Sequence, residues 1–351
     1  MSRSAVKRAL FFSLRFFGVN ALVRAAQGGN ILVLTYHGVL PEKHTVDRFG
    51  YHNTVSVAEF DRHLRFLRRH FHLLGVRDLQ ECVRGGRKLP PHPAVVTFDD
   101  GYRNNLTYAA PVLVRHGVSA VVFVSTGYIG ERRILWPTEI VLRVLQWPLA
   151  RLAPPEGGGE AEVPADLHGR RELAGRICRG AKRQSAEEAT KYLAYLRAHT
   201  RLDPGLASDD LHAFMTWDEV RELNRMGIDI GAHTVEHTIL SRLTPEEFRR
   251  ELRESKARVE RETGTECFAM AYPNGTRLDF TPAVVAAARE SGYTLAFTVT
   301  DDFHPAGGDP LAFNRMVVPG QVHQDVFEAH TCGSFRMLNM ALGSRPEAAG
   351  V

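Results

Sequence analysis

Two short segments of this 351-residue chain carry side chains that can activate water. One contains the adjacent carboxylates Asp99 and Asp100, and the other contains His233 and His237 in a His-x-x-x-His spacing. Two imidazoles and one carboxylate can hold a divalent metal, which leaves the second carboxylate free to act as a base. Each segment alone is a weak signal, because Asp-Asp-Gly is a common turn and surface histidines often share a helix face. Together they predict metal-assisted hydrolysis.

The same residues lie where the sequence predicts that β-strands end. A short apolar run precedes each of His37, Asp99 and His233. Strands are predicted at 31–36, 71–75, 94–98, 120–124, 228–231, 267–271 and 294–298, and helices at 57–70, 106–116, 216–227, 244–264 and 282–290. This alternation is typical of a parallel sheet covered by helices, and about seven or eight such strands favour a (β/α) barrel. Because catalytic groups of such barrels lie at the carboxyl ends of strands, we expect these side chains to meet there.

The composition is that of an ordinary globular protein. Apolar residues make up 44% of the chain, and the formal charge of +4 comes without a dominant basic tract, which argues against nucleic-acid binding. The four cysteines form no C-x-x-C pair, so we expect free thiols.

Residues 131–214 interrupt the alternation with loop-forming and charged helical stretches, and they are expected to form an insertion or lid within a domain at 29–330. Residues 331–351 have the character of a tail.

The N-terminal segment 1–28 is basic and amphipathic. It has five basic side chains and no acidic one, and Phe12, Phe16, Val19 and Val23 recur at helical spacing. Such a helix either lies on an anionic membrane or packs against its own domain. A cleaved signal peptide is disfavoured because an arginine splits the apolar stretch. We therefore expect a cytoplasmic protein with peripheral contact to an anionic membrane through this segment.

Three segments together resemble the motifs of a known family. Thr97–Tyr102 and His233–His237 resemble the first two motifs of the polysaccharide deacetylases, the NodB-like enzymes of carbohydrate esterase family 4, and the Tyr-Pro-Asn-Gly segment at 272–275 resembles the third. The resemblance covers residues 29–320. It implies an α/β fold, a distorted (β/α) barrel of NodB type with a helical insertion. It also implies a hydrolase that removes acetyl groups from N-acetylated sugars with a divalent metal, usually zinc.

The resemblance assigns roles to single residues. By position it makes Asp100, His233 and His237 the ligands of Zn²⁺ or another divalent first-row metal, and it makes Asp99 the general base. Three protein ligands leave a coordination position for water and the substrate carbonyl. Because an amine leaves only when it is protonated, the reaction also needs a general acid.

The general acid is where this chain departs from the common family pattern. Most members carry a Leu-x-x-His motif near the end of the domain, and the nearest segment here is Phe327–His330. A permuted branch, resembling the deacetylases of bacterial poly-N-acetylglucosamine, instead carries a histidine after the first strand, as in Tyr36–Val39. We predict that His37 is the general acid. His330 is the competing candidate, and a buried structural role is the alternative for His37.

A second departure concerns the arginine that orients the catalytic aspartate in many members. Ala271 stands at its position in this chain. Arg315 is the candidate replacement, because a guanidinium paired with Asp99 would hold that carboxylate ionised.

The expected function is removal of the N-acetyl group from an N-acetylhexosamine unit of a polysaccharide or a lipid-linked glycan. A formamido or acetamido sugar on a polyprenyl carrier, or another non-peptide amide, is the alternative substrate. A glycan-binding protein that has lost turnover is the alternative from another class. The residues predicted to bind the substrate are Trp136, Tyr272 and Asn274, with the two aromatic rings either stacked on a sugar face or packed in the core or lid.

Overall fold

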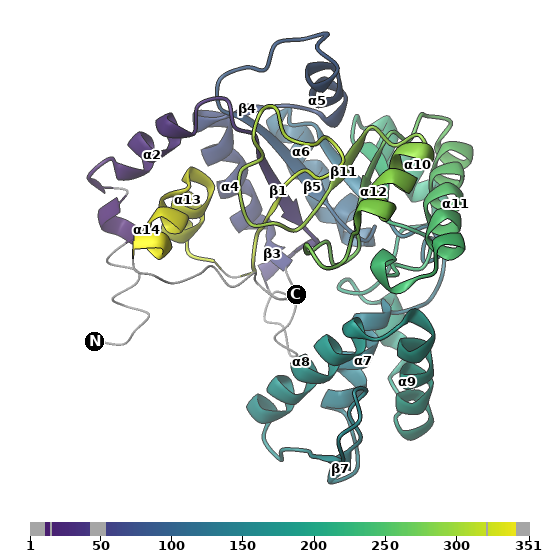
Figure 1. Cartoon of the computed structure of the whole chain (residues 1–351). Helices are drawn as coiled ribbons and strands as arrows, with labels where there is room; N and C mark the ends of the chain where they lie inside the picture. Colours follow the sequence, from purple (N-terminus) through teal and green to yellow (C-terminus); the bar gives the residue numbers. More distant parts are fainter. Residues whose placement is uncertain (1–10, 15, 43–53, 321, 342–351) are drawn as a thin grey trace.

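A curled, fully parallel sheet organises the structure (Figure 1). The structure is a computed structural model, and it describes residues 11–14, 16–42, 54–320 and 322–341. The strands run in the order β11-β10-β9-β6-β5-β1-β12, and β4 pairs with the start of β5. Their bounds are β1 Leu32–Tyr36, β4 His72–Leu73, β5 Pro93–Phe98, β6 Ala120–Val124, β9 Asp229–Ala232, β10 Ala269–Ala271, β11 Leu295–Phe297 and β12 Met316–Val317.

The segment just before β12 joins the two ends of this sheet. Phe313 forms a parallel bridge with Phe297 in β11, and β12 then pairs with β1. Arg315 lies between these two contacts and is fully buried. The sheet therefore closes into an irregular barrel, and the predicted barrel of NodB type is confirmed.

Both faces of the central strands are buried, which explains why their sequences are continuously apolar. Leu34 and Val96 pack with the helices outside the sheet. Val33, Val95 and Val121 belong to a second cluster on the opposite face. Side chains alternate along a strand, so every second residue belongs to the same face. The polar groups of the site continue the face of this second cluster just beyond the strand ends.

Helices and short accessory strands cover the sheet. Their bounds are β2 Gly38–Leu40, β3 Thr54–Ser56, α4 Val57–His70, α5 Val76–Val83, the π-helical turn η1 Asn105–Ala109, α6 Ala110–His116, α10 Trp217–Arg225, the short 3₁₀ turn η3 Leu240–Arg242, α11 Pro245–Thr263 and α12 Pro282–Glu290. Capping boxes start α4 at Ser56, α10 at Thr216 and α11 at Thr244, where the side chain of the third helical residue bonds back to the cap. The sequence predicts helix starts at two of these positions from a threonine with a glutamate three residues later, Thr216 with Glu219 and Thr244 with Glu247, and the structure confirms them.

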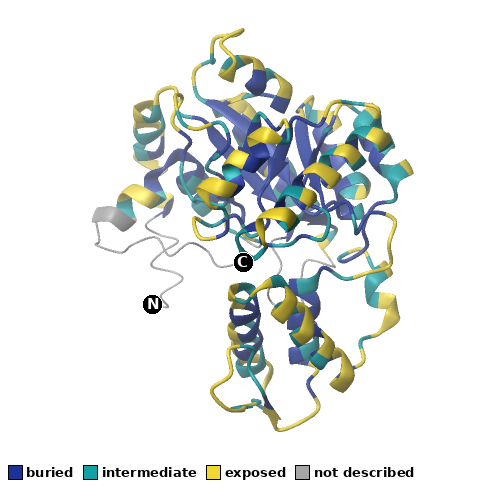
Figure 2. Ribbon diagram, turned by 45° about the vertical axis from the view of Figure 1, so that its right-hand side comes forward, coloured by how far each residue is buried: buried dark blue, intermediate teal, exposed yellow. Residues whose placement is uncertain are grey.

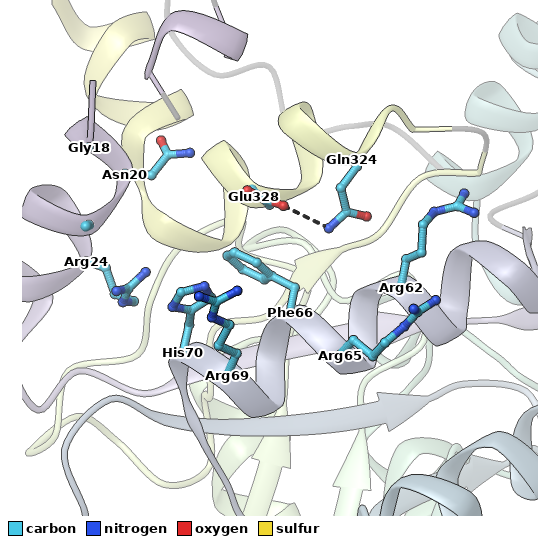
Figure 3. A pocket seen from close by; sticks show the side chains of 11 residues that line it. Gly18, Asn20, Arg24, Arg62, Arg65, Phe66, Arg69, His70, Gln324 and Glu328 are labelled. Atoms are coloured by element: carbon cyan, nitrogen blue, oxygen red, sulfur yellow. Dashed lines mark hydrogen bonds between the residues drawn. The ribbon is translucent and has the colours of Figure 1, made fainter. Parts of the chain in front are cut away.

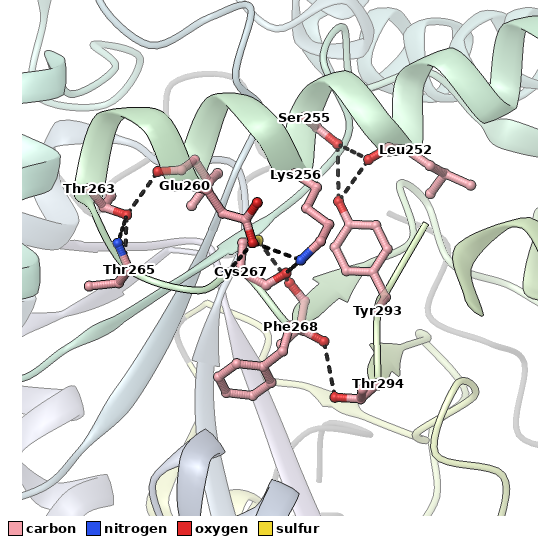
Figure 4. Close-up of polar contacts among 12 residues, drawn as sticks. Leu252, Ser255, Lys256, Glu260, Thr263, Thr265, Cys267, Phe268, Tyr293 and Thr294 are labelled. Atoms are coloured by element: carbon pink, nitrogen blue, oxygen red, sulfur yellow. Dashed lines mark hydrogen bonds and ion pairs between the residues drawn. The ribbon is translucent and has the colours of Figure 1, made fainter. Parts of the chain in front are cut away.

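Polar contacts tie α11 to the strands beneath it (Figure 4). Lys256 Nζ donates to the carbonyl of Cys267 at 2.6 Å, and Glu260 Oε1 accepts from the backbone N–H of the same residue at 3.1 Å. Tyr293, which leads into β11, donates its hydroxyl to the carbonyl of Leu252 at 3.0 Å. These bonds fix the starts of β10 and β11 against the helix, and so hold one side of the barrel in register.

The segment between β6 and α10 forms a helical lobe below the barrel (Figure 1). It contains α7 Trp136–Leu145, the hairpin β7 Arg151–Leu152 with β8 Ala161–Glu162, α8 Leu167–Arg183, α9 Ala186–His199 and the 3₁₀ turn η2 Pro204–Ser208. The three helices pack around their own apolar cluster, which includes Ile140, Trp147 and Ile177. Figure 2 shows buried stretches in the helices of this lobe. The lobe lies within the range in which the sequence predicted an insertion.

The first and last labelled helices of the described chain pack together beside α4. The helix α2 Val19–Gln27 contacts α13 Gln324–Cys332 and α14 Ser334–Ala341. The expected tail from 331 therefore begins as helix, although its last ten residues lie outside the described part. Residues 1–10 and Arg15 of the N-terminal segment lie outside it too. Within the described residues, Gly18 has a φ of 72° before α2, so the predicted apolar stripe is interrupted there.

No helix in the described ranges is both long and apolar enough to cross a bilayer. The four cysteines are free, as predicted, and three of them are buried.

Candidate active site and metal centre

The chemistry-bearing residues converge at the carboxyl ends of neighbouring strands. In the β1–β5 register Tyr36 lies beside Phe98, so His37 and Asp99 follow on adjacent strands and on the same face. His233 follows β9, two strands away from β5. The backbone turns sharply at Asp100, which has a φ of 75°. Because this left-handed conformation departs from the strand alternation, both aspartates can line the same site.

Asp100, His233 and His237 form a buried cluster that fits a metal ion. One ligand atom from each of the three side chains lies within 4.8 Å of the others. Asp100 Oδ1 is 3.6 Å from His233 Nε2 and 3.3 Å from His237 Nε2. The Oδ1 atom makes no hydrogen bond although it is buried, and a buried carboxylate oxygen without a partner is costly unless a ligand satisfies it.

A backbone carbonyl selects the tautomer of His233. Its Nδ1 lies 2.8 Å from the carbonyl oxygen of Ala271, which can only accept, so Nδ1 carries the hydrogen and Nε2 presents its lone pair to the cluster. Burial lowers the pKa of His233 to about 4, which keeps the ring neutral at physiological pH. One carboxylate and two imidazoles form a donor set typical of zinc and other divalent first-row metals.

The segment that carries the two histidines is held by contacts on several sides. Glu251 in α11 accepts hydrogen bonds from the backbone N–H groups of Val235 and Glu236 at 2.7 and 3.2 Å. The loop after β6 bonds to the same turn, since the N–H of Gly127 donates to the carbonyl of Val235 at 2.8 Å. Trp136 Nε1 donates to the carbonyl of His237 at 3.0 Å. The ligand spacing is therefore fixed by α11, the β6 loop and the insertion together.

Asp99 is clamped by a buried guanidinium. Arg315 Nη1 and Nη2 each donate to one oxygen of Asp99 at 2.7 Å, a bidentate arrangement. Arg315 is held in turn by the carbonyl of Thr298 at 2.8 Å and the hydroxyl of Thr97 at 3.1 Å. The rings of Phe123 and Phe297 flank its guanidinium. The predicted pairing of Arg315 with Asp99 is present in the structure.

Both aspartates are ionised. Burial by itself would raise the pKa of Asp99, but the Arg315 guanidinium outweighs it and holds the pKa of that carboxyl below its usual range. The pKa of Asp100 is lowered as well, because its histidine neighbours, with His237 foremost, outweigh the effect of burial. The site thus contains one carboxylate without a hydrogen bond on its inward oxygen and a second carboxylate oriented by arginine.

His37 follows the strand beside the one that leads to the two aspartates. The N–H of Asp99 donates to the carbonyl of Tyr36 at 3.0 Å, which fixes the start of His37 next to Asp99, and the His37 imidazole contributes to lowering the pKa of both Asp99 and Asp100. The carbonyl of His37 accepts a hydrogen bond from Asn105 Nδ2 at 3.0 Å, and its buried Nδ1 has no partner. The next residue is Gly38, where an added Cβ would lie 2.9 Å from Thr54. The close packing there fixes the direction in which the chain leaves β1.

The competing candidate, His330, lies elsewhere. It is on α13, where its Nε2 is 2.7 Å from Asp301 Oδ1 and its ring packs against Phe335. Neither of these residues is part of the cluster. The structure therefore brings His37, but not His330, together with the two aspartates.

Comparison with known proteins agrees with this geometry. The sequence model of polysaccharide deacetylases matches residues 86–166 and 180–296, which is more than half of the chain. The protein belongs to the polysaccharide deacetylase family. It is a hydrolase of the class that acts on amide C–N bonds. Its membership of this family supports deacetylation of a glycan as the reaction.

Individual relatives of this deacetylase are distant. YxkH of Bacillus subtilis (strain 168), a protein assigned to the polysaccharide deacetylases, is 18% identical over 325 residues, covering 92% of this chain and 84% of its own length. IcaB from Ammonifex degensii is 19% identical, with 86% of this chain and 97% of that chain covered at a TM-score of 0.54. The Streptococcus pyogenes deacetylase PplD, solved with acetate, is 17% identical, with coverages of 83% and 92% and a TM-score of 0.53. At these identities the structural likeness establishes the shared fold.

Among the residues predicted to bind substrate, Tyr272 has its ring packed in the core, the other possibility left open for it. Its side chain is buried, its ring stacks on Phe280 with centroids 4.8 Å apart, and its hydroxyl donates to the carbonyl of Leu311 at 3.0 Å. No ring face is left for a sugar. The residue directly follows a strand, and its ring belongs to the cluster between sheet and helices.

The side chain of Asn274 forms hydrogen bonds to the insertion and to the loop that follows the third motif. Its Oδ1 accepts from Lys182 Nζ of α8 at 2.9 Å, and its Nδ2 donates to Asp279 at 2.6 Å. It therefore connects the insertion to the third motif, and its substrate role stays a prediction.

Trp136 is half-buried and lines a cavity of about 330 Å³ between the insertion and the barrel. This cavity also contacts Thr238, next to the ligand His237. The position fits the predicted contact with substrate.

Sequence reasoning did not select Thr97 or Glu251. Thr97 could have been found, because it precedes Asp99 by two residues and so shares its strand face. Glu251 had no comparable signal, since it is one of many charged residues in α11 and is distinguished only by burial and by the N–H groups it accepts.

Proposed function

We propose that this protein is a metal-dependent hydrolase that removes the acetyl group from an N-acetylhexosamine unit of a glycan. The observation that carries the proposal is the meeting of the Asp100, His233 and His237 cluster with an ionised, arginine-clamped Asp99 where the strands β5 and β9 end. The unsatisfied inward oxygen of Asp100 and the neutral imidazole of His233 support a bound cation. When bound, a divalent metal would polarise the amide carbonyl and lower the pKa of water.

Asp99 then serves as the general base. The bidentate contact with Arg315 fixes the plane of the carboxylate, and each oxygen keeps a further lone pair with which it can accept a proton from water. Because Arg315 is itself held by Thr97 and Thr298, the base is oriented before substrate arrives. Such preorganisation avoids a reorganisation cost during the reaction.

His37 serves as the general acid. It lies on the strand next to the one that carries Asp99, and the amine of the substrate needs a proton to leave as the C–N bond breaks. An imidazole is suited to this step, since its ordinary pKa lies near neutrality.

The glycan extends from this centre into the cavity that Trp136 lines. The indole of Trp136 is fixed by its bond to the His237 carbonyl, so one wall of the cavity is coupled directly to the ligand segment. An aromatic wall with polar neighbours suits a sugar ring.

Metal analysis and acetate release test the proposal. Purified protein should contain a divalent first-row metal, and it should release acetate from N-acetylglucosamine oligomers or from a lipid-linked N-acetyl sugar. Chelation should abolish the activity. Asp99→Asn should keep the metal and lower kcat by about 10²–10⁴-fold, whereas Asp100→Asn should lose the metal.

Asp301→Asn is the matched control, because Asp301 is a carboxylate that follows β11 and pairs with His330 rather than with the site. An Asp99→Asn variant with wild-type turnover would overturn the base assignment. Metal-free protein without any acetate release would favour a glycan-binding role instead.

A further inference from the structure

An exposed aromatic cluster lies on the N-terminal segment. The exposed fractions are 55% for Phe12, 71% for Phe16, 73% for Phe17 and 72% for Leu22. The Phe12 and Phe16 rings stack at 6.0 Å, and the Phe16 and Phe17 rings meet edge to face at 5.2 Å. A contiguous patch of large apolar side chains in water is unfavourable for a soluble surface and marks a site of interaction.

The segment is anchored from its other side. Phe11 is buried and stacks on Phe335 of α14 at 5.6 Å. Arg24 of α2 approaches Cys332 Sγ at 3.8 Å and lies over the ring of Phe71. The exposed rings are therefore presented from a segment that is packed on the body of the protein.

A basic pocket of about 480 Å³ lies beside the residues that follow this cluster in the sequence (Figure 3). Gly18, which follows Phe17, lines it together with the arginines of α2 and α4, and α13 closes the far side. The four arginines are Arg24, Arg62, Arg65 and Arg69.

Positive charge dominates the pocket. Among the described residues that line it, Glu328 is the one carboxylate, and it accepts from Gln324 at 3.1 Å. Arg65 is paired with Asp61 at 2.6 Å. Within the described part of the chain, Arg62 and Arg69 are exposed and no carboxylate pairs with them. Their guanidinium groups are thus available to an anion from outside, and a guanidinium matches the geometry of phosphate oxygens.

We propose that this face docks on a membrane containing anionic phospholipid. The side chains of Phe12, Phe16, Phe17 and Leu22 enter the interface between headgroups and acyl chains, and the arginines of the pocket bind the lipid phosphates. A phosphorylated protein or a nucleic acid would use the arginines but leave the aromatic cluster in water. A bilayer accounts for both features, because apolar burial and attraction to anionic lipid add in interfacial binding.

Vesicle binding of the full-length protein tests the proposal. The bound fraction is measured by co-sedimentation with phosphatidylcholine alone and with phosphatidylcholine mixed with phosphatidylglycerol, over a range of salt concentrations. Wild-type protein should prefer the anionic vesicles. The double variant Arg62→Gln with Arg69→Gln should lose at least about tenfold in affinity for them and show a weaker salt dependence. Phe16→Ser with Phe17→Ser should weaken binding at every salt concentration.

Two variants on other surfaces are matched controls. Arg253→Gln removes an exposed arginine of α11, and Leu278→Ser removes a leucine that is 76% exposed. Both should bind vesicles like wild type. Circular dichroism and the unfolding temperature check that each variant is folded.

Equal binding of the aromatic double variant and wild type would overturn the proposal, as would equal binding to neutral and anionic vesicles. A wild-type dimer in solution that becomes monomeric when Phe16 and Phe17 are replaced, with no vesicle binding, would assign the patch to a second copy of the chain. This outcome would also overturn the proposal. The metal and acetate measurements on the catalytic site are independent of all these results.

Discussion

Arg315 in the barrel and the arginines of the α2–α4 pocket carry the same charge in opposite surroundings. Arg315 is fully buried, and its three nitrogens are all engaged by Thr298, Thr97 and Asp99. Arg62 and Arg69 are exposed on one face of α4. The buried guanidinium acts on a partner within the chain and sets the ionisation of the base. The exposed ones keep their hydrogen-bonding capacity for a partner that the chain does not supply.

The difference shows how a charge is given either a catalytic or a docking role. A buried pair is rigid and water-excluded, so its field is strong, but removing one member leaves an uncompensated charge. An exposed arginine contributes little to folding and is screened by salt. For folding, arginine is therefore essential at the buried position of Arg315 and replaceable at the exposed positions of the α2–α4 pocket.

The largest expected effect comes from breaking the buried pair. Arg315→Met leaves Asp99 ionised and unpaired, and it should lower the free energy of unfolding by about 3–5 kcal/mol in urea titrations. Arg62→Met in the exposed set should change it by no more than about 0.5 kcal/mol.

Arg315→Lys separates folding from catalysis. It restores the charge without the bidentate geometry, so it should fold but raise the pKa of Asp99, moving the acid limb of the activity profile to higher pH. Equal destabilisation by Arg315→Met and Arg62→Met would remove the contrast between the two regions.

The next effect distinguishes two histidines that belong to the two regions. His37 lies with the aspartates, whereas His330 lies on α13, the helix that closes the basic pocket. His37→Ala should lower kcat by about 10²–10⁴-fold, and His330→Ala should stay close to wild type.

A substrate whose leaving group needs no proton, such as an aryl acetate, should recover much of the loss in His37→Ala. The reverse ranking of the two variants would place the acid on α13. Failure of the aryl ester to recover activity would instead point to a structural role for His37.

The smallest effect involves His63, which lies between the two regions. Its ring stacks on Phe327 at 3.7 Å, and Tyr36 Oη is 3.3 Å from its Nδ1. Burial, assisted by the positive charge of Arg62, lowers the pKa of His63 to about 3. Below pH 6.5 the unfolded chain therefore binds a proton that the folded protein excludes, so stability falls as the pH falls through this range.

Between pH 7.5 and 5 this one group should cost about 2 kcal/mol of unfolding free energy. His63→Gln should flatten the dependence by that amount when the free energy of unfolding is measured at each pH. Parallel curves for the variant and wild type would show that other groups set the acid sensitivity.

Much of the barrel was predictable because the signals are local. The apolar run of β6 and the helix α12 were predicted with the bounds that the structure shows, and the caps of α10 and α11 were read from residues three apart. The strand β12 was missed, since it is only two residues long and too short for any period to show. The N-terminal stripe was predicted as continuous, and Gly18 interrupts it with a left-handed conformation.

The residues of the site that lie within the sequence motifs were predictable. The grouping of Asp99, Asp100, His233 and His237 follows from strand ends meeting at one edge of a parallel sheet. The choice between a sugar contact and core packing stayed open for the Tyr272 ring, because residue type alone does not reveal burial. The direction of its side chain is set by the packing of Phe280 and by the carbonyl of Leu311.

By itself, then, the sequence determined the alternation of strands and helices, the positions of the carboxylates and imidazoles, and the family to which the chain belongs. These depend on periodicity and on contiguous motifs. The sequence offered Arg315 as a candidate partner of Asp99, and only the tertiary structure decided that it clamps both carboxylate oxygens from 216 residues away. It also decided that Phe11 is buried while Phe12 and Phe16 are exposed. The physical reason is that ion pairing and burial depend on which distant surfaces meet when the barrel closes, and no local pattern encodes that meeting.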